Sequence, residues 1–273
     1  FGSELVLGSF LIKLLPIVIF LFFNANINIK KNSYFIILFF SLYFTIIYIS
    51  GGRTPFFLML LFILFSIIFI KNLRGIFLKS SLILTIFVCI TFVFEIGKSN
   101  TAKRMFLKTF SQITNYYFYE KKDDVLVEKK EFIKEVKIFS SDHQGHYILA
   151  YDLFKKSPIW GIGPKGFRHY CRGVDFDPPI GICSTHPHNF LIQIISETGL
   201  IGLIFYLTAL TFIVLKFLKS YWIKHQVDKN CFLVISIGLL INFFPFVPNG
   251  NFFNNWISTI NFYYIGLYMY SYK

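Results

Sequence analysis

The chain has 273 residues, of which 55% are hydrophobic, 21% are aromatic and only 15% are charged. Soluble domains carry about a quarter charged residues, so this composition excludes an ordinary soluble domain and indicates a membrane protein. The formal net charge of +13 does not indicate a nucleic-acid partner, because the lysines lie in short loops between apolar runs.

Seven apolar runs predict seven membrane helices, so we expect an all-α, polytopic helical bundle. The first four helices lie within residues 1–94 and the last three within residues 189–273, and a polar insert at 95–188 separates them. Because residue 1 is Phe and no signal peptide precedes the first run, we expect that N-terminal helices are missing. The expected helices are 1–23, 34–50, 56–70, 80–94, 189–218, 231–247 and 256–270, and the fourth can extend back toward Gly75.

The short loops at 24–33, 71–80 and 216–230 carry Lys or Arg, and they all fall on one side of the membrane if the helices alternate. Positive loops mark the cytoplasmic side. The large insert is therefore expected on the outer side.

Arg53 lies in the sequence SGGRTP at the outer end of the second expected helix. A guanidinium group binds phosphate through a paired fork, so Arg53 suits a phosphate or pyrophosphate group. An interfacial arginine that only extends toward the headgroups would give the same pattern. Both interpretations stay open at this stage.

His143 and His146 lie on a helix expected at 142–156, which the capping box Ser141-x-x-Gln144 would open. At a spacing of three they share a face. Exposed backbone N–H groups near a helix start favour anions, so these histidines are candidates for substrate binding. Two solvated loop histidines remain the alternative.

The glycine-rich sequence GIGPKGF at 161–167 lacks the GK[ST] ending of a P-loop, and no strand precedes it. It predicts a turn that leads into a short helix at 164–172, on which Arg168 and Arg172 lie one turn apart. Cys171 and Cys183 are both in the insert, and a closely spaced pair in an external compartment favours a disulfide.

The sequence THPHN places His186 and His188 directly before Asn189, which can cap the next helix. Asn189, Gln193 and Glu197 follow on one face of that helix and carry a polar stripe about 12 Å into the membrane. An ionisable residue at that depth is costly and indicates function, although a structural hydrogen bond to a neighbouring helix is the alternative.

Four imidazoles, from His143, His146, His186 and His188, could also form a zinc site. The chain contains no protease-like HExxH pattern in this region. We therefore predict no metal site.

These segments resemble the O-antigen ligase and polymerase-like membrane family, whose pattern is G-x-G…H-x-H-N…E-x-G-x-x-G. The matching elements are GIG at 161–163, HPHN at 186–189 and ETGLIG at 197–202, and SGGRTPFFLMLL at 50–61 resembles the family's arginine segment. The start of the chain and the segment at 244–256 also look like it. Many members carry an arginine before the G-x-G turn where this chain has Gln144-Gly145-His146, so we expect Arg168 to supply the second anion-binding arginine.

The resemblance implies a multi-pass glycosyltransferase of the bacterial inner membrane, with residues 95–188 as a periplasmic catalytic loop and no cofactor. Its donor would be a glycan on undecaprenyl diphosphate. The acceptor would be lipid A–core in a ligase or a growing polysaccharide in a polymerase, and both stay open. A transporter of lipid-linked glycans and a zinc-dependent membrane hydrolase are the alternatives from other classes.

For that reaction we expect His188 to act as general base or to orient the acceptor, with His186 in support. Arg53 and Arg168 would stabilise charge on the diphosphate leaving group. Glu197 would orient His188 or position the first turn of its helix. Further substrate contacts are expected from His143, His146, Arg172 and Asn189.

Overall fold

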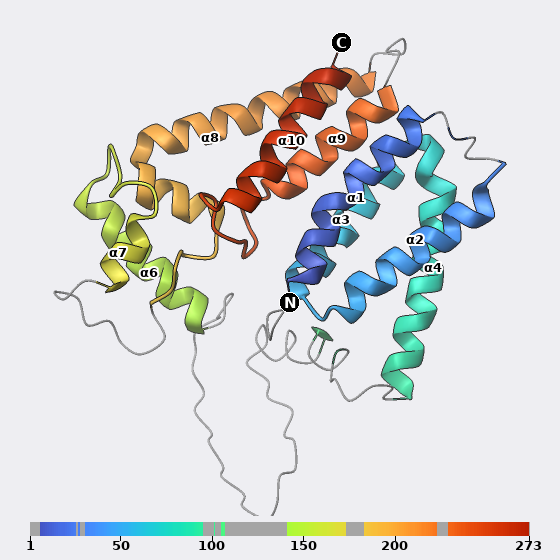
Figure 1. The fold of residues 1–273 in the computed structure, drawn as a ribbon, viewed down its shortest axis with the longest axis horizontal. Coiled ribbons are helices and arrows are strands. Elements are labelled where there is room, and N and C mark those ends of the chain that lie inside the picture. Colours follow the sequence, from blue (N-terminus) through green and yellow to red (C-terminus); the bar gives the residue numbers. More distant parts are fainter. Residues whose placement is uncertain are drawn as a thin grey trace, which may run out of the picture.

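The computed structural model describes residues 6–25, 27, 31–94, 101, 105–106, 141–172, 183–222 and 229–272. Within these residues the fold is all-helical and contains no strand, as the composition predicts (Figure 1). Most of the insert between 95 and 140 lies outside the described residues. The helices are α1 (Leu7–Asn24), α2 (Ser33–Ile49), α3 (Arg53–Phe69), α4 (Lys71–Val93), α6 (Ser141–Lys156), α7 (Gly166–Arg172), α8 (Phe190–Trp222), α9 (Lys229–Asn242) and α10 (Asn255–Ser271).

Each of the seven expected apolar segments is helical, although the segment at 189–218 is broken at Gly199. Helices α6 and α7 match the two helices expected in the insert. Three helices, α1, α4 and α8, are long and apolar enough to cross a membrane. The apolar helices α2, α3 and α9 are shorter. Length and composition therefore indicate a membrane protein.

The expected loop at 71–80 is wrong, because these residues form the first turns of α4. A single extended residue, Ile70, separates α3 from α4. The guanidinium of Arg74 donates to the carbonyls of Ile67 and Ile68, at 2.9 and 3.3 Å, and so satisfies the last turn of α3. Because this junction needs only one residue, no loop forms.

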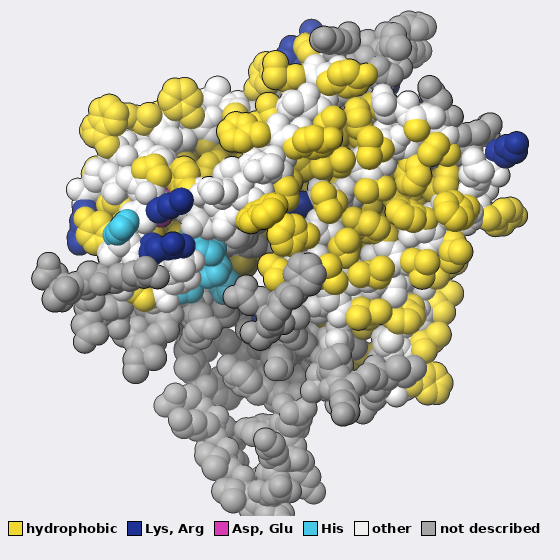
Figure 2. All heavy atoms as spheres, viewed as in Figure 1, with side chains coloured by type: hydrophobic (Ala, Val, Ile, Leu, Met, Phe, Trp, Pro, Cys, Tyr) yellow, Lys and Arg dark blue, Asp and Glu magenta, His cyan; other side chains and the backbone are white. Residues whose placement is uncertain are grey.

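Aromatic side chains fill the core between the first helices. Phe77 of α4 packs edge-on against Phe40 and Phe44 of α2, with ring centroids 5.2 and 5.6 Å apart. All three rings are fully buried. Hydrophobic side chains also cover the outer surface of the bundle, whereas histidine and Lys/Arg side chains gather on the side of α6 and α7 (Figure 2).

Helix α8 is not the continuous helix that the apolar run predicts. Gly199 has φ 64° and ψ −161°, so the helix breaks nine residues after its start. The first part, from Phe190, lies beside α6 and α7, and the second part runs along the bundle (Figure 1). A small core joins α6 to α7, formed by Leu149, Ala150, Leu153 and Phe167.

Candidate functional site

The turn at residues 158–163 is paired with the break in α8 through the backbone. A break leaves carbonyl and N–H groups without partners inside the helix. Here the turn satisfies them, so the two segments form one unit. The bonds run from Ile162 N to Ser196 O (3.1 Å), Gly163 N to Glu197 O (2.9 Å), Leu200 N to Pro158 O (2.9 Å) and Ile201 N to Ile159 O (3.4 Å).

Two glycines permit this close approach. A Cβ atom on Gly161 would collide with the backbone of Glu197, and one on Gly199 would collide with the backbone of Ile159. Both glycines also have positive φ, which other residues rarely adopt. The G-x-G and E-x-G parts of the sequence pattern therefore contact each other directly.

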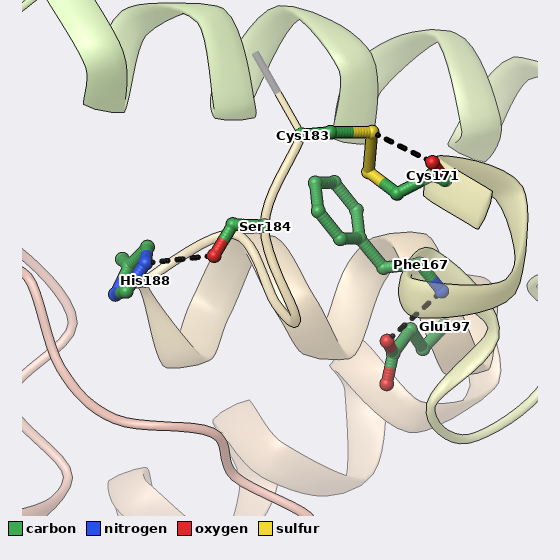
Figure 3. The surroundings of a disulfide bond; sticks show 6 residues. All are labelled: Phe167, Cys171, Cys183, Ser184, His188 and Glu197. Carbon is green, nitrogen blue, oxygen red and sulfur yellow. Dashed lines mark hydrogen bonds between the residues drawn. A yellow bond between two sulfur atoms is a disulfide. The ribbon is translucent and has the colours of Figure 1, made fainter. Parts of the chain in front are cut away.

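Glu197 completes the same unit with its side chain, which is fully buried. Oε2 accepts from the backbone N–H of Lys165 at 2.9 Å, and Oε1 accepts from that of Phe167 at 3.2 Å. In Figure 3 the carboxylate faces the start of α7 and lies apart from His188. Its contacts thus hold the turn and α7, and they differ from the expected contact with His188.

Asn189 and Gln193 attach the loop between α9 and α10 to the start of α8. Asn189 Oδ1 accepts from the N–H of Ile192 at 3.1 Å, which is the expected cap, and its Nδ2 donates to the carbonyls of Pro245 and Val247. Gln193 donates to Asn251 Oδ1 at 2.9 Å. Asn189 and Gln193 are both buried, so these contacts are structural supports of the site.

Four histidine rings converge at the start of α8. The ring centroid of His188 lies 4.1 Å from that of His186, 5.2 Å from that of His146 and 5.5 Å from that of His143. His143 and His146 of α6 are thus brought together with His188, which is more than 40 residues away in sequence. The expected shared face of His143 and His146 is directed at His188.

The backbone of His188 is held in an unusual conformation. Its φ is 57°, in the left-handed region, and its carbonyl accepts a hydrogen bond from the N–H of Asn249 at 2.6 Å. Its Nε2 lies 3.0 Å from the hydroxyl of Ser184. His186 is tied separately, with Nδ1 2.9 Å from Thr185 Oγ1. Ser184 therefore holds the ring of His188, and Asn249 holds its backbone.

Both histidines of the THPHN segment are uncharged at neutral pH. Burial, followed by the neighbouring His146 and His143, lowers the pKa of His188 to about 4. Burial, followed by the charge on His188, lowers the pKa of His186 to about 3. At pH 7 both rings are neutral, so each can accept a proton.

The arginines occupy different positions. Arg168 of α7 lies close enough to contribute to the lowered pKa of His186, and its Nε is buried without a hydrogen-bond partner among the described residues. Arg53 is the first residue of α3 and is partly buried. Arg172 ends α7, and its side chain lies outside the described part of the structure, so the expected pairing with Arg168 stays a prediction.

A disulfide joins Cys171 and Cys183, whose Cα atoms are 5.3 Å apart. Phe167 lies between this disulfide and Glu197, and Ser184, the hydrogen-bond partner of His188, directly follows Cys183 (Figure 3). The disulfide therefore links the end of α7 to the segment that carries the histidines.

A zinc site formed by the four histidines is the alternative that the sequence raises. Among the residues that the structure describes, no group of three or more His, Cys, Asp or Glu side chains is arranged to hold a metal ion.

Sequence reasoning missed the contributions of Ser184, Asn249 and Asn251. The sequence FPFVPNGNFFNNW, which resembles the family, was the only signal for the two asparagines.

A family model described as O-antigen ligase matches residues 37–207, which is more than half of the chain. The chain belongs to the O-antigen ligase family. The match includes Arg53, α6, α7, the THPHN segment and the break in α8. No curated protein and no solved structure matches the chain. Membership of the O-antigen ligase family supports an enzyme of the ligase or polymerase type that acts on a glycan.

Proposed function

We propose that this protein is an inner-membrane glycosyltransferase of the O-antigen ligase type. It moves a glycan from undecaprenyl diphosphate to lipid A–core at the periplasmic face. The observation that carries the proposal is the convergence of four histidine rings and Arg168 at the start of α8. This cluster combines groups that accept a proton with a cation for a phosphate leaving group.

His188 is the general base in this proposal. The acceptor hydroxyl gives its proton to the imidazole while its oxygen attacks the anomeric carbon of the donor sugar. The bond from that carbon to the diphosphate oxygen breaks, and undecaprenyl diphosphate leaves as the anion. When Nε2–H of His188 donates to Ser184, Nδ1 carries the lone pair that accepts the proton.

The arginines stabilise the charge that develops on the diphosphate. A buried N–H donor without a partner costs about 1–3 kcal/mol, and an anionic ligand would supply the acceptor that Arg168 Nε lacks within the described residues. Arg53 stands at the start of α3, where the helix dipole also favours a negative charge. Donors aimed at the leaving group lower the barrier because they need no reorganisation.

The proposed topology has seven membrane helices, α1 to α4 and α8 to α10. Residues 95–188 then form the periplasmic loop. Lysines lie at the opposite ends of these helices, at Lys31, Lys71, Lys219 and Lys229. Such a bias marks the cytoplasmic side and supports this orientation.

A polymerase would use the same chemistry with a growing polysaccharide as acceptor, and the family match favours it as the second candidate. Purified protein should be incubated with a glycan on undecaprenyl diphosphate, with EDTA present, and with or without lipid A–core. We expect a glycan–lipid A product that mass spectrometry detects. Chains of linked repeat units without lipid A would establish the polymerase. Absence of both products, or activity that EDTA removes, would contradict the proposal.

A further inference from the structure

Lys13 is a lysine within the apolar helix α1, and the mechanism above gives it no role. It is the seventh of the 18 residues of this helix, about 9 Å from its start at 1.5 Å per residue. Burying an ionisable side chain at such a depth in a membrane is costly, and such residues usually face a functional site. The residue as a whole is only partly buried.

The ammonium group of Lys13 is held by neutral groups. Nζ donates to Oδ1 of Asn242 at 2.9 Å and lies 5.6 Å from the ring centroid of Phe190. Among the described residues, no carboxylate pairs with it. An ammonium has three donors, and Asn242 occupies one of them. The contacts therefore orient the charge without neutralising it.

Both partners of Lys13 belong to the segments that fix His188. The side chain of Asn249 donates to the carbonyl of Asn242 at 3.4 Å, and the backbone N–H of Asn249 donates to the carbonyl of His188 at 2.6 Å. Phe190 follows His188 by two residues. Through Asn242 and Phe190, Lys13 of α1 thus contacts the segments that hold the histidine cluster in place.

Gly8, nearer the start of α1, lies against the beginning of α3, whose first residue is Arg53. A Cβ atom on Gly8 would lie 3.2 Å from Cβ of Pro55, two residues after Arg53. Gly8 precedes Lys13 by five residues, about 7.5 Å along the helix. The first half of α1 therefore lies near the start of α3, which Arg53 begins, and near Phe190 at the start of α8. Figure 1 shows the starts of α1 and α8 toward the same end of the bundle.

We propose that Lys13 binds phosphate oxygens of the lipid diphosphate, as a third cation of the site beside Arg53 and Arg168. This inference rests on the proposed function, which supplies the diphosphate. An ammonium is a compact point charge that binds phosphate without the fixed geometry of a guanidinium fork. Because the donor lipid is anchored in the bilayer, a cation placed part-way into a membrane helix can meet its headgroup.

The test is the binding of geranylgeranyl diphosphate, a short polyprenyl diphosphate, to the purified protein in detergent. Geranylgeraniol and phosphatidylglycerol are titrated in parallel, to separate the isoprenoid chain and an ordinary lipid phosphate from the diphosphate. Lys13→Gln should weaken binding of the diphosphate about 10- to 100-fold, because a hydrogen bond to a charged group is lost. Binding of the other two lipids should not change, and Lys13→Arg should recover most of the affinity.

Lys216→Gln is the matched control. Lys216 also lies in a membrane helix, but near the far end of α8, where it donates to the hydroxyl of Tyr272 at 2.5 Å. Its substitution should leave binding of the diphosphate unchanged. Unchanged affinity in folded Lys13→Gln, or an equal loss for phosphatidylglycerol, would overturn the role of Lys13. A wild-type protein that binds no geranylgeranyl diphosphate would instead contradict the proposed function itself.

A second measurement uses only the wild-type chain and does not depend on the folding of a variant. An amine-acetylating reagent should modify Lys13, and mass spectrometry should show that geranylgeranyl diphosphate protects it while geranylgeraniol does not. Acetylation of Lys216 should be the same in all samples. Equal acetylation of Lys13 with and without the diphosphate would overturn the inference.

Discussion

The backbone N–H of Phe167 donates to Oε1 of Glu197 at 3.2 Å, and this bond joins the start of α7 to the broken helix α8 (Figure 3). Lys165 and Gln193 donate to the other carboxylate oxygen, at 2.9 and 3.1 Å. Three donors, two from the start of α7 and one from α8 itself, thus meet on one buried carboxylate. The residues that carry Arg168 and the disulfide depend on it for their position.

Glu197→Ala should destabilise this unit, because it leaves three donors without an acceptor. A buried unsatisfied donor costs about 1–3 kcal/mol. Thermal unfolding of the purified Glu197→Ala protein should show a lower midpoint than that of the wild type. The midpoint of Glu197→Gln should lie between those of the wild type and Glu197→Ala, because an amide keeps one acceptor oxygen. Equal midpoints for all three proteins would show that the carboxylate does not hold the turn.

Gly199→Ala should impair folding or abolish transfer. An added Cβ would collide with the backbone of Ile159, and the positive φ is itself unfavourable for alanine. Gly75→Ala is the control, since a Cβ at that position in α4 meets nothing within 4 Å. The control should retain the wild-type midpoint or gain up to about 1 kcal/mol in stability. Similar behaviour of both variants would contradict the proposed backbone contact.

For Glu197, the sequence predicts the position on the helix but not the contacts of the side chain. The spacing of Asn189, Gln193 and Glu197 predicts one polar face on a helix, and the structure places all three in buried contacts at the start of α8. The spacing contains no information about the turn at 158–163, which lies more than 30 residues earlier. A glycine inside an apolar run also fits a continuous helix, so the break at Gly199 depends on tertiary hydrogen bonds.

Reduction of the bond between Cys171 and Cys183 should lower stability and transfer together. The bridge closes a loop of about a dozen residues, which corresponds to roughly 3 kcal/mol from chain entropy. Mass spectrometry of non-reduced peptides should detect the linked pair. Free alkylation of both Cys171 and Cys183 in the native protein would contradict the bridge.

The histidines predict an unusual dependence on pH. Since burial lowers the pKa of His188 from 6.5 to about 4, the folded protein binds fewer protons than the unfolded chain between these values. Stability should therefore fall as the pH decreases from 6.5 to 4. The base itself stays neutral over most of this range, so kcat/KM should fall near pH 4. An acid limb near pH 6.5 would contradict the buried setting of His188.

The sequence predicts only part of the histidine cluster. The pattern THPHN identifies His186 and His188 as neighbours of a helix start, and the spacing of His143 and His146 predicts a shared face. That this face meets His188 depends on the packing of α6 against α8, through the core around Leu153 and Phe167. Apolar residues of this kind have many alternative partners, so spacing alone does not select the pair.

The central claim is that His188 accepts the proton of the acceptor hydroxyl. His188→Asn tests it most directly, because asparagine tolerates the left-handed backbone that His188 adopts and has no basic nitrogen. His169→Asn, on the exposed surface of α7, is the control. Transfer from a purified undecaprenyl diphosphate-linked glycan, measured with EDTA present, should fall about 10²- to 10⁴-fold in His188→Asn and remain at the wild-type rate in His169→Asn. Wild-type activity in a folded His188→Asn protein would contradict the mechanism.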